Sequence, residues 1–110
     1  MNVLTLAGEH PRLHAEAVVA AGETFHVRLP ATFASGFAWQ VIEQPAGLIV
    51  TEDDFEAIPP SDLAGGPAIQ RIGFRAAHAT CGRLRLSYQQ SWDQTSRIRD
   101  CVIDVQATDA

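Results

Sequence analysis

Four segments of this chain alternate between apolar and polar residues with a period of two, and this pattern most constrains the fold. The segments are Phe25–Leu29, Arg71–Arg75, Arg83–Gln89 and Cys101–Ala107. Successive side chains of a β-strand point to opposite faces, so each segment has one apolar face for a core and one polar face for water. Sheets of this kind bury their apolar faces against each other. The pattern therefore predicts an all-β sandwich of about seven or eight strands with little helix.

Shorter strands are predicted at Asn2–Leu6, Ala17–Ala21, Phe37–Ile42 and Leu48–Thr51. The alanine-rich stretch from His14 to Ala21 is also compatible with a helix, but its adjacent valines, Val18 and Val19, favour a strand. Pro30 has no N–H to give to a ladder and is expected to end its strand. The acidic stretch Glu52–Pro60 ends in two prolines and is expected to be irregular.

Three breaks between the predicted strands carry glycine, an aromatic residue or both: Thr32-Phe33-Ala34-Ser35-Gly36, Leu63-Ala64-Gly65-Gly66 and Gln90-Ser91-Trp92. Strands of a sandwich run up and down, so breaks that follow alternate strands emerge at the same end. Immunoglobulin-like sandwiches build binding surfaces from loops gathered in this way. We therefore predict that Gly36, Gly65 and Trp92 lie at the same end of the sandwich.

The size and charge of the chain narrow its function class. It has 110 residues, of which 46% are hydrophobic, so one folded domain spanning 1–110 is expected. The formal net charge of −5 argues against a general nucleic-acid binder. No apolar run is long enough for a transmembrane helix, and Met1 to Leu13 is not expected to be a signal peptide, because it has no basic region followed by an apolar core. We expect a monomer without nucleic-acid or membrane partners, cytoplasmic as the sequence stands, and periplasmic or secreted if a leader is removed.

The chain contains two cysteines, Cys81 and Cys101. Cys101 shares its parity with the apolar residues of its strand, so it is predicted to face the core. A hairpin turning near Gln94 would pair Cys101 with a residue in Leu86–Tyr88, far along the strand from Cys81. One disulfide and two free thiols are both compatible with the sequence, and this placement favours buried free thiols.

No sequence motif for catalysis is present, since the chain lacks a GxSxG elbow, a P-loop and a GxGxxG turn. The four histidines have no metal-ligand spacing, and His26, on the polar face of its strand, is expected to be solvated. The run Glu52-Asp53-Asp54 lacks the spacing of a calcium loop. Ser91, Asp93 and His78 have no spacing that supports a triad. We predict no enzymatic activity, no catalytic residues, no metal site and no cofactor.

The segment Gly22–Trp39 closely resembles the chagasin family of cysteine-protease inhibitors. The matching features are the Gly22-Glu23 turn, the Leu29-Pro30 strand end, Gly36 and the Phe37-Ala38-Trp39 run. The family's second signature is a glycine-rich loop after a proline-containing stretch, and Ala64-Gly65-Gly66 after Pro59-Pro60 is similar to it. The third signature, Arg-Pro-Trp after a Leu-x-Tyr strand end, is resembled by Leu86-Ser87-Tyr88 followed by Gln90-Ser91-Trp92.

The resemblance implies an immunoglobulin-like sandwich whose three loops form a wedge. In the family, this wedge enters the active-site cleft of papain-like cysteine proteases and blocks it without being cleaved. The central loop meets the catalytic cysteine and histidine, and the other two loops grip the cleft on either side. The protease-binding residues implied for this chain are Thr32, Phe33, Ala34, Ser35, Gly36, Ala64, Gly65, Gly66, Gln90, Ser91 and Trp92.

The departures from the family pattern lie among these contact residues. Thr32-Phe33-Ala34-Ser35 stands where the family has Asn-Pro-Thr-Thr, and Gln90-Ser91 stands where it has Arg-Pro. Without proline, φ at position 33 is unconstrained and the loop is less preorganised. Without arginine, the third loop lacks a charged anchor of the kind that often dominates an interface. We therefore expect weaker inhibition than in family members that keep these residues.

Several of these residues also have a purely structural interpretation. Gly36 suits a turn that needs a positive φ, and Trp39 is expected in the core. Trp92 lies in a polar hairpin and is expected to be an exposed anchor. Two other functions remain open. One is a binding module for a changed partner on the same scaffold, and the other is an accessory domain in which Phe33 and Trp92 would be buried.

Overall fold

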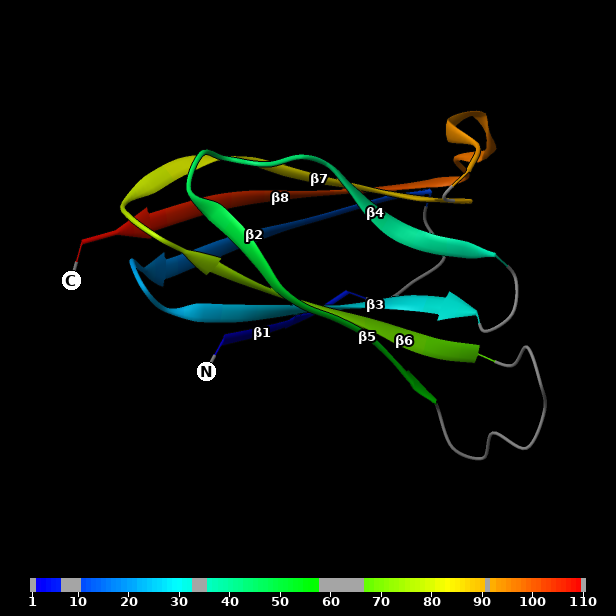
Figure 1. Ribbon diagram of the computed structural model, residues 1–110, viewed down its shortest axis with the longest axis horizontal. Coiled ribbons are helices and arrows are strands. Elements are labelled where there is room, and N and C mark those ends of the chain that lie inside the picture. The colour runs from blue at the N-terminus through cyan, green and yellow to red at the C-terminus, as the bar shows by residue number, and fades with distance from the viewer. Residues whose placement is uncertain (1, 7–10, 33–35, 58–66, 91, 110) are drawn as a thin grey trace.

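The computed structural model describes residues 2–6, 11–32, 36–57, 67–90 and 92–109. The strands are β1 (Asn2–Thr5), β2 (Arg12–Ala20), β3 (Thr24–Thr32), β4 (Phe37–Glu43), β5 (Leu48–Ala57), β6 (Pro67–Ala76), β7 (Thr80–Gln90) and β8 (Arg99–Thr108), and the 3-10 helix η1 is Gln94–Ser96. They form two four-stranded sheets, ordered β1-β3-β6-β5 and β2-β8-β7-β4, which lie face to face (Figure 1). The predicted all-β sandwich is confirmed. Within the described ranges, no helix is long and apolar enough to cross a membrane.

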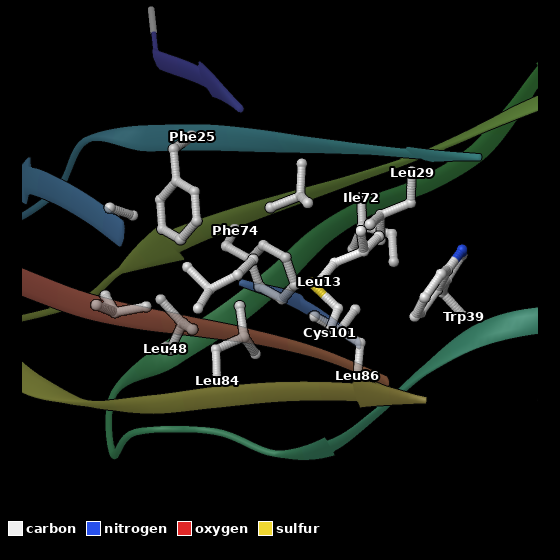
Figure 2. Close-up of a cluster of buried hydrophobic side chains, with 14 of the residues drawn as sticks. Leu13, Phe25, Leu29, Trp39, Leu48, Ile72, Phe74, Leu84, Leu86 and Cys101 are labelled. Carbon is white, nitrogen blue, oxygen red and sulfur yellow. The ribbon is translucent and has the colours of Figure 1, made fainter. Parts of the chain in front are cut away.

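The core lies between the two sheets and is formed by the apolar side chains on the inward face of the strands (Figure 2). Its largest fully buried apolar side chains are Trp39, Phe25, Phe74, Leu29, Ile72, Leu84, Leu86 and Ile103. Phe25 and Phe74 are cross-strand partners whose rings stack with centroids 5.4 Å apart. Burying one such side chain contributes about 1.5–3 kcal/mol, so this layer is a main source of stabilisation between the sheets.

Both cysteines are free thiols in this fold, as predicted, but the expectation that both are buried is wrong for Cys81. The β7–β8 hairpin places Cys101 opposite Leu86, in the predicted part of the partner strand. Cys101 is buried in the core, whereas Cys81 is exposed on the outer face of the same sheet. Burial raises the pKa of the Cys101 thiol to about 12, because the thiolate cannot be solvated there, although the charge of Arg99 opposes the shift.

Two strands continue through segments that were predicted to end or interrupt them. The expectation that Pro30 ends its strand is wrong, because β3 continues to Thr32 with Pro30 opposite Ile69. β1 pairs with β3 only as far as Arg28, so within the described residues this part of β3 has one strand neighbour, and proline is tolerated in such an edge position. The expectation that Glu52–Pro60 is irregular is also wrong as far as Ala57, and positions 58–60 lie outside the described residues.

The acidic stretch forms a strand because it occupies an edge and has basic neighbours. Among the strands of the described residues, β5 pairs only with β6, and its register shifts between Val50 and Glu52. Edge strands tolerate charges, which also discourage pairing with another chain. Glu52 lies 3.4 Å from Arg71, and Glu56 lies 3.1 Å from Arg28.

The alanine-rich segment near the N-terminus forms a strand, so the strand interpretation is confirmed. This strand, β2, begins earlier than predicted, at Arg12.

The prediction that His26 is solvated is wrong, because only 6% of the residue is exposed. His26 faces outward from β3, but its partner on β6 is Gly73, which has no side chain to hold the ring away from the sheet. A β-carbon at Gly73 would lie 3.1 Å from Cδ2 of the histidine ring. Glu52 covers the ring from β5, with its Oε2 3.5 Å from Nε2. His26 is therefore buried although it lies on the polar face of its strand, because its cross-strand neighbour is a glycine.

Candidate functional site

The segments that flank the three predicted loops meet at one end of the sandwich (Figure 1). In one sheet, the last residue of β3, Thr32, is opposite Pro67 at the start of β6, and Ala57 at the end of β5 is opposite Ala68. In the other sheet, Phe37 at the start of β4 is opposite Gln90 at the end of β7. The strand ends on either side of all three breaks therefore share one end of the molecule, which we call the loop end.

Gly36 and Trp92 are in contact at the loop end. Gly36 has φ of +78°, and a β-carbon added to it would lie 2.7 Å from Cη2 of the Trp92 indole. Both the backbone conformation and the ring therefore require glycine at this position. The indole covers Gly36 on one side, yet 71% of Trp92 remains exposed. An exposed tryptophan held against the backbone of a neighbouring segment is a ready anchor for a partner protein.

The segment that presents Trp92 is ordered by a network of local hydrogen bonds. Asp93 caps η1, and its Oδ1 accepts bonds from the N–H and the hydroxyl of Thr95 at 2.9 and 2.6 Å. These bonds lower the pKa of Asp93 below its ordinary value of 3.8. The N–H of Gln90 donates to Oγ of Ser96 at 2.8 Å, which closes the segment onto the end of β7. Trp92 thus lies inside a hydrogen-bonded turn, which lowers the entropy lost on binding.

A cluster of aromatic side chains lies between the sheets next to the loop end and supports it. Tyr88 is almost fully buried, and its ring lies 5.6 Å from Phe37 and 5.2 Å from Trp39. Its hydroxyl accepts a hydrogen bond from the backbone N–H of Thr32 at 3.1 Å. The indole N–H of Trp39 donates to the carbonyl of Pro30 at 2.9 Å. Both bonds join the end of β3 to the other sheet, so the flanks of the first and third loops are tied together.

Gln70 clamps the same region from the opposite sheet. Its side chain is 1% exposed. Its Oε1 accepts from the backbone N–H of Trp39 at 2.7 Å, and its Nε2 donates to the carbonyl of Trp39 at 3.1 Å. Nε2 also donates to Oδ1 of Asp53 at 2.9 Å. The amide therefore connects β4, β5 and β6 next to the loop end.

The predicted site residues fall into two groups. Thr32, Gly36, Gln90 and Trp92 lie at the loop end, and the structure brings Gly36 and Trp92 into contact. The others lie outside the described residues: Phe33, Ala34, Ser35, Ala64, Gly65, Gly66 and Ser91. The predicted common end therefore holds for Gly36 and Trp92 and for the strands on both sides of Gly65.

Sequence reasoning missed the residues that support these loops. Gln70 shares its parity with Ile72 and Phe74, so a polar residue on an apolar face was the available signal. Asp93 followed by Thr95 is the pattern of a helix cap or an Asx turn. Tyr88 was noted only as part of a strand end, and nothing in the sequence indicated that its hydroxyl reaches the end of β3.

Comparison with known protein families shows to which family this chain belongs. The sequence profile described as chagasin family peptidase inhibitor I42 matches residues 18–106, which include the described flanks of all three loops. The chain belongs to the chagasin family. Its members are peptidase inhibitors, and the conclusion that the chain is an inhibitor and not an enzyme follows from this membership. A search of curated protein sequences finds no match.

Solved structures share the chagasin-family fold. The structure of PbICP-C in complex with falcipain-2 aligns with a TM-score of 0.73 and 16% identity, covering 98% of this chain and 100% of the other. The cysteine protease inhibitor EhICP2 from Entamoeba histolytica aligns with a TM-score of 0.75 and 21% identity, covering 96% and 94%. Amebosin aligns with a TM-score of 0.61 and 21% identity, covering 90% and 100%. These similarities confirm the predicted immunoglobulin-like sandwich.

Proposed function

We propose that this chain inhibits papain-like cysteine proteases by inserting its loop end into the active-site cleft. The observation that carries the proposal is the contact between Gly36 and Trp92, because it joins two of the family's signature loops at one end of the sandwich. Family membership supports peptidase inhibition. The similar fold of PbICP-C, solved with the papain-like protease falcipain-2, supports this class of target.

The proposed contact residues are Phe33, Ser35, Gly65, Gly66 and Trp92. Phe33 takes the place of the family's proline as an apolar contact, and Trp92 is the main anchor. A contact of about 800 Å² per partner is expected, which is the usual size for a protease–inhibitor complex. Affinity is lower than in members with Pro, Thr and Arg in these loops, since the first loop is less constrained and the third lacks a cation.

A titration tests the proposal. The wild-type protein, at concentrations up to high micromolar, should slow peptide hydrolysis by papain and related enzymes and leave a trypsin-like serine protease unaffected. The same papain with its catalytic cysteine blocked by a bulky covalent reagent should bind the protein more weakly, because the reagent fills the cleft. If none of several papain-like enzymes is slowed, the inhibitor proposal fails, and a binding module with a changed partner replaces it.

A further inference from the structure

Two consecutive turns that share Asp93 follow the end of β7. The N–H of Asp93 donates to the carbonyl of Gln90 at 3.1 Å and closes the first turn, of which Trp92 is the third of four residues. The N–H of Ser96 donates to the carbonyl of Asp93 at 3.2 Å and closes the second turn, which forms η1. Bonds from residue i+3 back to residue i are those of β-turns and 3-10 turns. Trp92 therefore lies inside one closed turn and directly next to another.

The side chain of Ser96 links these two turns. Its hydroxyl donates to the carbonyl of Asp93 at 2.5 Å and accepts from the N–H of Gln90 at 2.8 Å. A serine hydroxyl can make both bonds because it has one hydrogen to donate and lone pairs that accept. The two bonded backbone groups belong to the first and the last residue of the turn that contains Trp92. An alanine in place of Ser96 would remove both bonds at once.

The indole of Trp92 depends on this turn for its position. The residue is 71% exposed, and the indole lies over Gly36 on the neighbouring strand end. An exposed side chain is not fixed by surrounding atoms as a core side chain is, so the conformation of its own backbone decides where it points. If the turn opens, the indole leaves Gly36. The hydroxyl of Ser96 therefore acts on the part of the surface that is proposed to anchor a protease.

We infer that Ser96 is a positioning residue for inhibition, because its hydroxyl holds the turn of Trp92 in the conformation that the protease binds. This inference rests on the proposed function and extends it to a residue outside the proposed contact set. Ser96 is half-buried and its hydroxyl is bonded to the backbone of the turn, so it acts through Trp92. Binding weakens in proportion when the competent conformation is only partly populated. Loss of the hydroxyl should therefore slow association and leave dissociation nearly unchanged, since the bound protease holds the indole.

The test compares Ser96→Ala with Ser87→Ala, which is the same chemical change on β7. Ser87 is fully buried, and among the described residues its hydroxyl has no hydrogen-bond partner, so its removal breaks no bond. Association and dissociation rates are measured with papain and with related enzymes. NMR relaxation of the two indole N–H groups reports the mobility of Trp92 and of the buried Trp39 separately. Thermal unfolding of each variant verifies that the fold is retained.

Ser96→Ala should associate about fivefold more slowly than wild type, a factor that corresponds to the loss of one ordinary hydrogen bond. The indole of Trp92 should become more mobile in this variant, and the indole of Trp39 should not. Ser87→Ala should stay within about twofold of wild type in both rates.

A double-variant cycle separates positioning from direct contact. In a Trp92→Ala background, Ser96→Ala should weaken inhibition no further, because the residue that it positions is gone. The inference alone is overturned if Ser96→Ala weakens inhibition equally with and without Trp92, acts mainly on dissociation, or has no effect while the wild type inhibits. A wild type that inhibits none of the enzymes would overturn the proposed function itself.

Discussion

At the scale of single residues, the loop end depends on one glycine and one tryptophan that fit each other. Gly36 adopts a positive φ and has no side chain, and the indole of Trp92 occupies the space that a side chain would fill. Replacement of Gly36 by alanine should therefore have two effects: it strains the backbone and it displaces the indole of Trp92. Neither effect removes a contact from the hydrophobic core, so we expect the change to weaken binding more than folding.

We predict that Gly36→Ala weakens inhibition of a papain-like protease by roughly tenfold, because the indole must move from its binding position. Gly22→Ala is the matched control. Gly22 also has a positive φ, of 86°, but its added β-carbon would meet nothing within 4 Å. The two variants should lose similar stability in thermal unfolding, and only Gly36→Ala should lose inhibition. Equal inhibition constants for both would show that the Gly36–Trp92 contact has no part in binding.

A second prediction concerns the buried thiol of Cys101. Its pKa is about 12 in the folded protein and 9.0 as an ordinary thiol, so above pH 9 the unfolded chain loses a proton that the folded chain retains. Folding stability should therefore fall as pH rises from 9 toward 12, by roughly 1 kcal/mol for the first unit. Urea unfolding at pH 8 and 10 measures the change. Cys101→Ala should flatten the dependence, whereas Cys81→Ala should preserve it, and the reverse pattern would contradict the account.

At the scale of elements, the backbone ladder joins β4 to β7 in its own sheet, and side chains hold β4 to the opposite sheet. Gln70 satisfies both backbone groups of Trp39 from β6, and the indole of Trp39 reaches Pro30 on β3. An amide buried with all of these partners specifies the position of β4, because an alternative packing would leave several polar groups unpaired. The loop end is rigid on its inner side for this reason.

We predict that Gln70→Leu lowers the free energy of unfolding by about 2–3 kcal/mol, because it leaves the backbone N–H and carbonyl of Trp39 buried without their partner. Gln106→Leu is the control, since Gln106 is exposed on β8 and should change stability by less than about 0.5 kcal/mol. Denaturant titration of both variants measures the difference. A loss from Gln70→Leu no greater than that of the control would show that the clamp adds no stability.

The sequence predicted elements well where a period of two extended over a whole strand, and poorly where neighbouring strands decide the outcome. The apolar residues of Phe25–Leu29 and Arg83–Gln89 face the core as predicted, because alternation alone determines their side. Pro30, His26 and the acidic end of β5 were misjudged, since each depends on which strand lies alongside. The support of the candidate site by Gln70 and Tyr88 was not predictable for the same reason, because both act across the two sheets.

At the scale of the whole molecule, both sheets contribute strand ends to the loop end. One sheet contributes the ends of β3 and β5 and the start of β6, and the other contributes the start of β4 and the end of β7 (Figure 1). The core between them fixes the distance between the loops, so the surface is set by the sandwich and not by any single loop. Changes in the loops can therefore alter the target while the fold stays the same.

The inhibition constants of Trp92→Ala and Val18→Ala for a papain-like protease test the central claim most directly. Both residues are exposed, 71% and 66%, but Val18 is on the outer face of β2, away from the loop end. Trp92→Ala should weaken inhibition about thirtyfold, which corresponds to about 2 kcal/mol, and Val18→Ala should match wild type. If Trp92→Ala inhibits as well as wild type does, the loop end is not the surface that binds the protease.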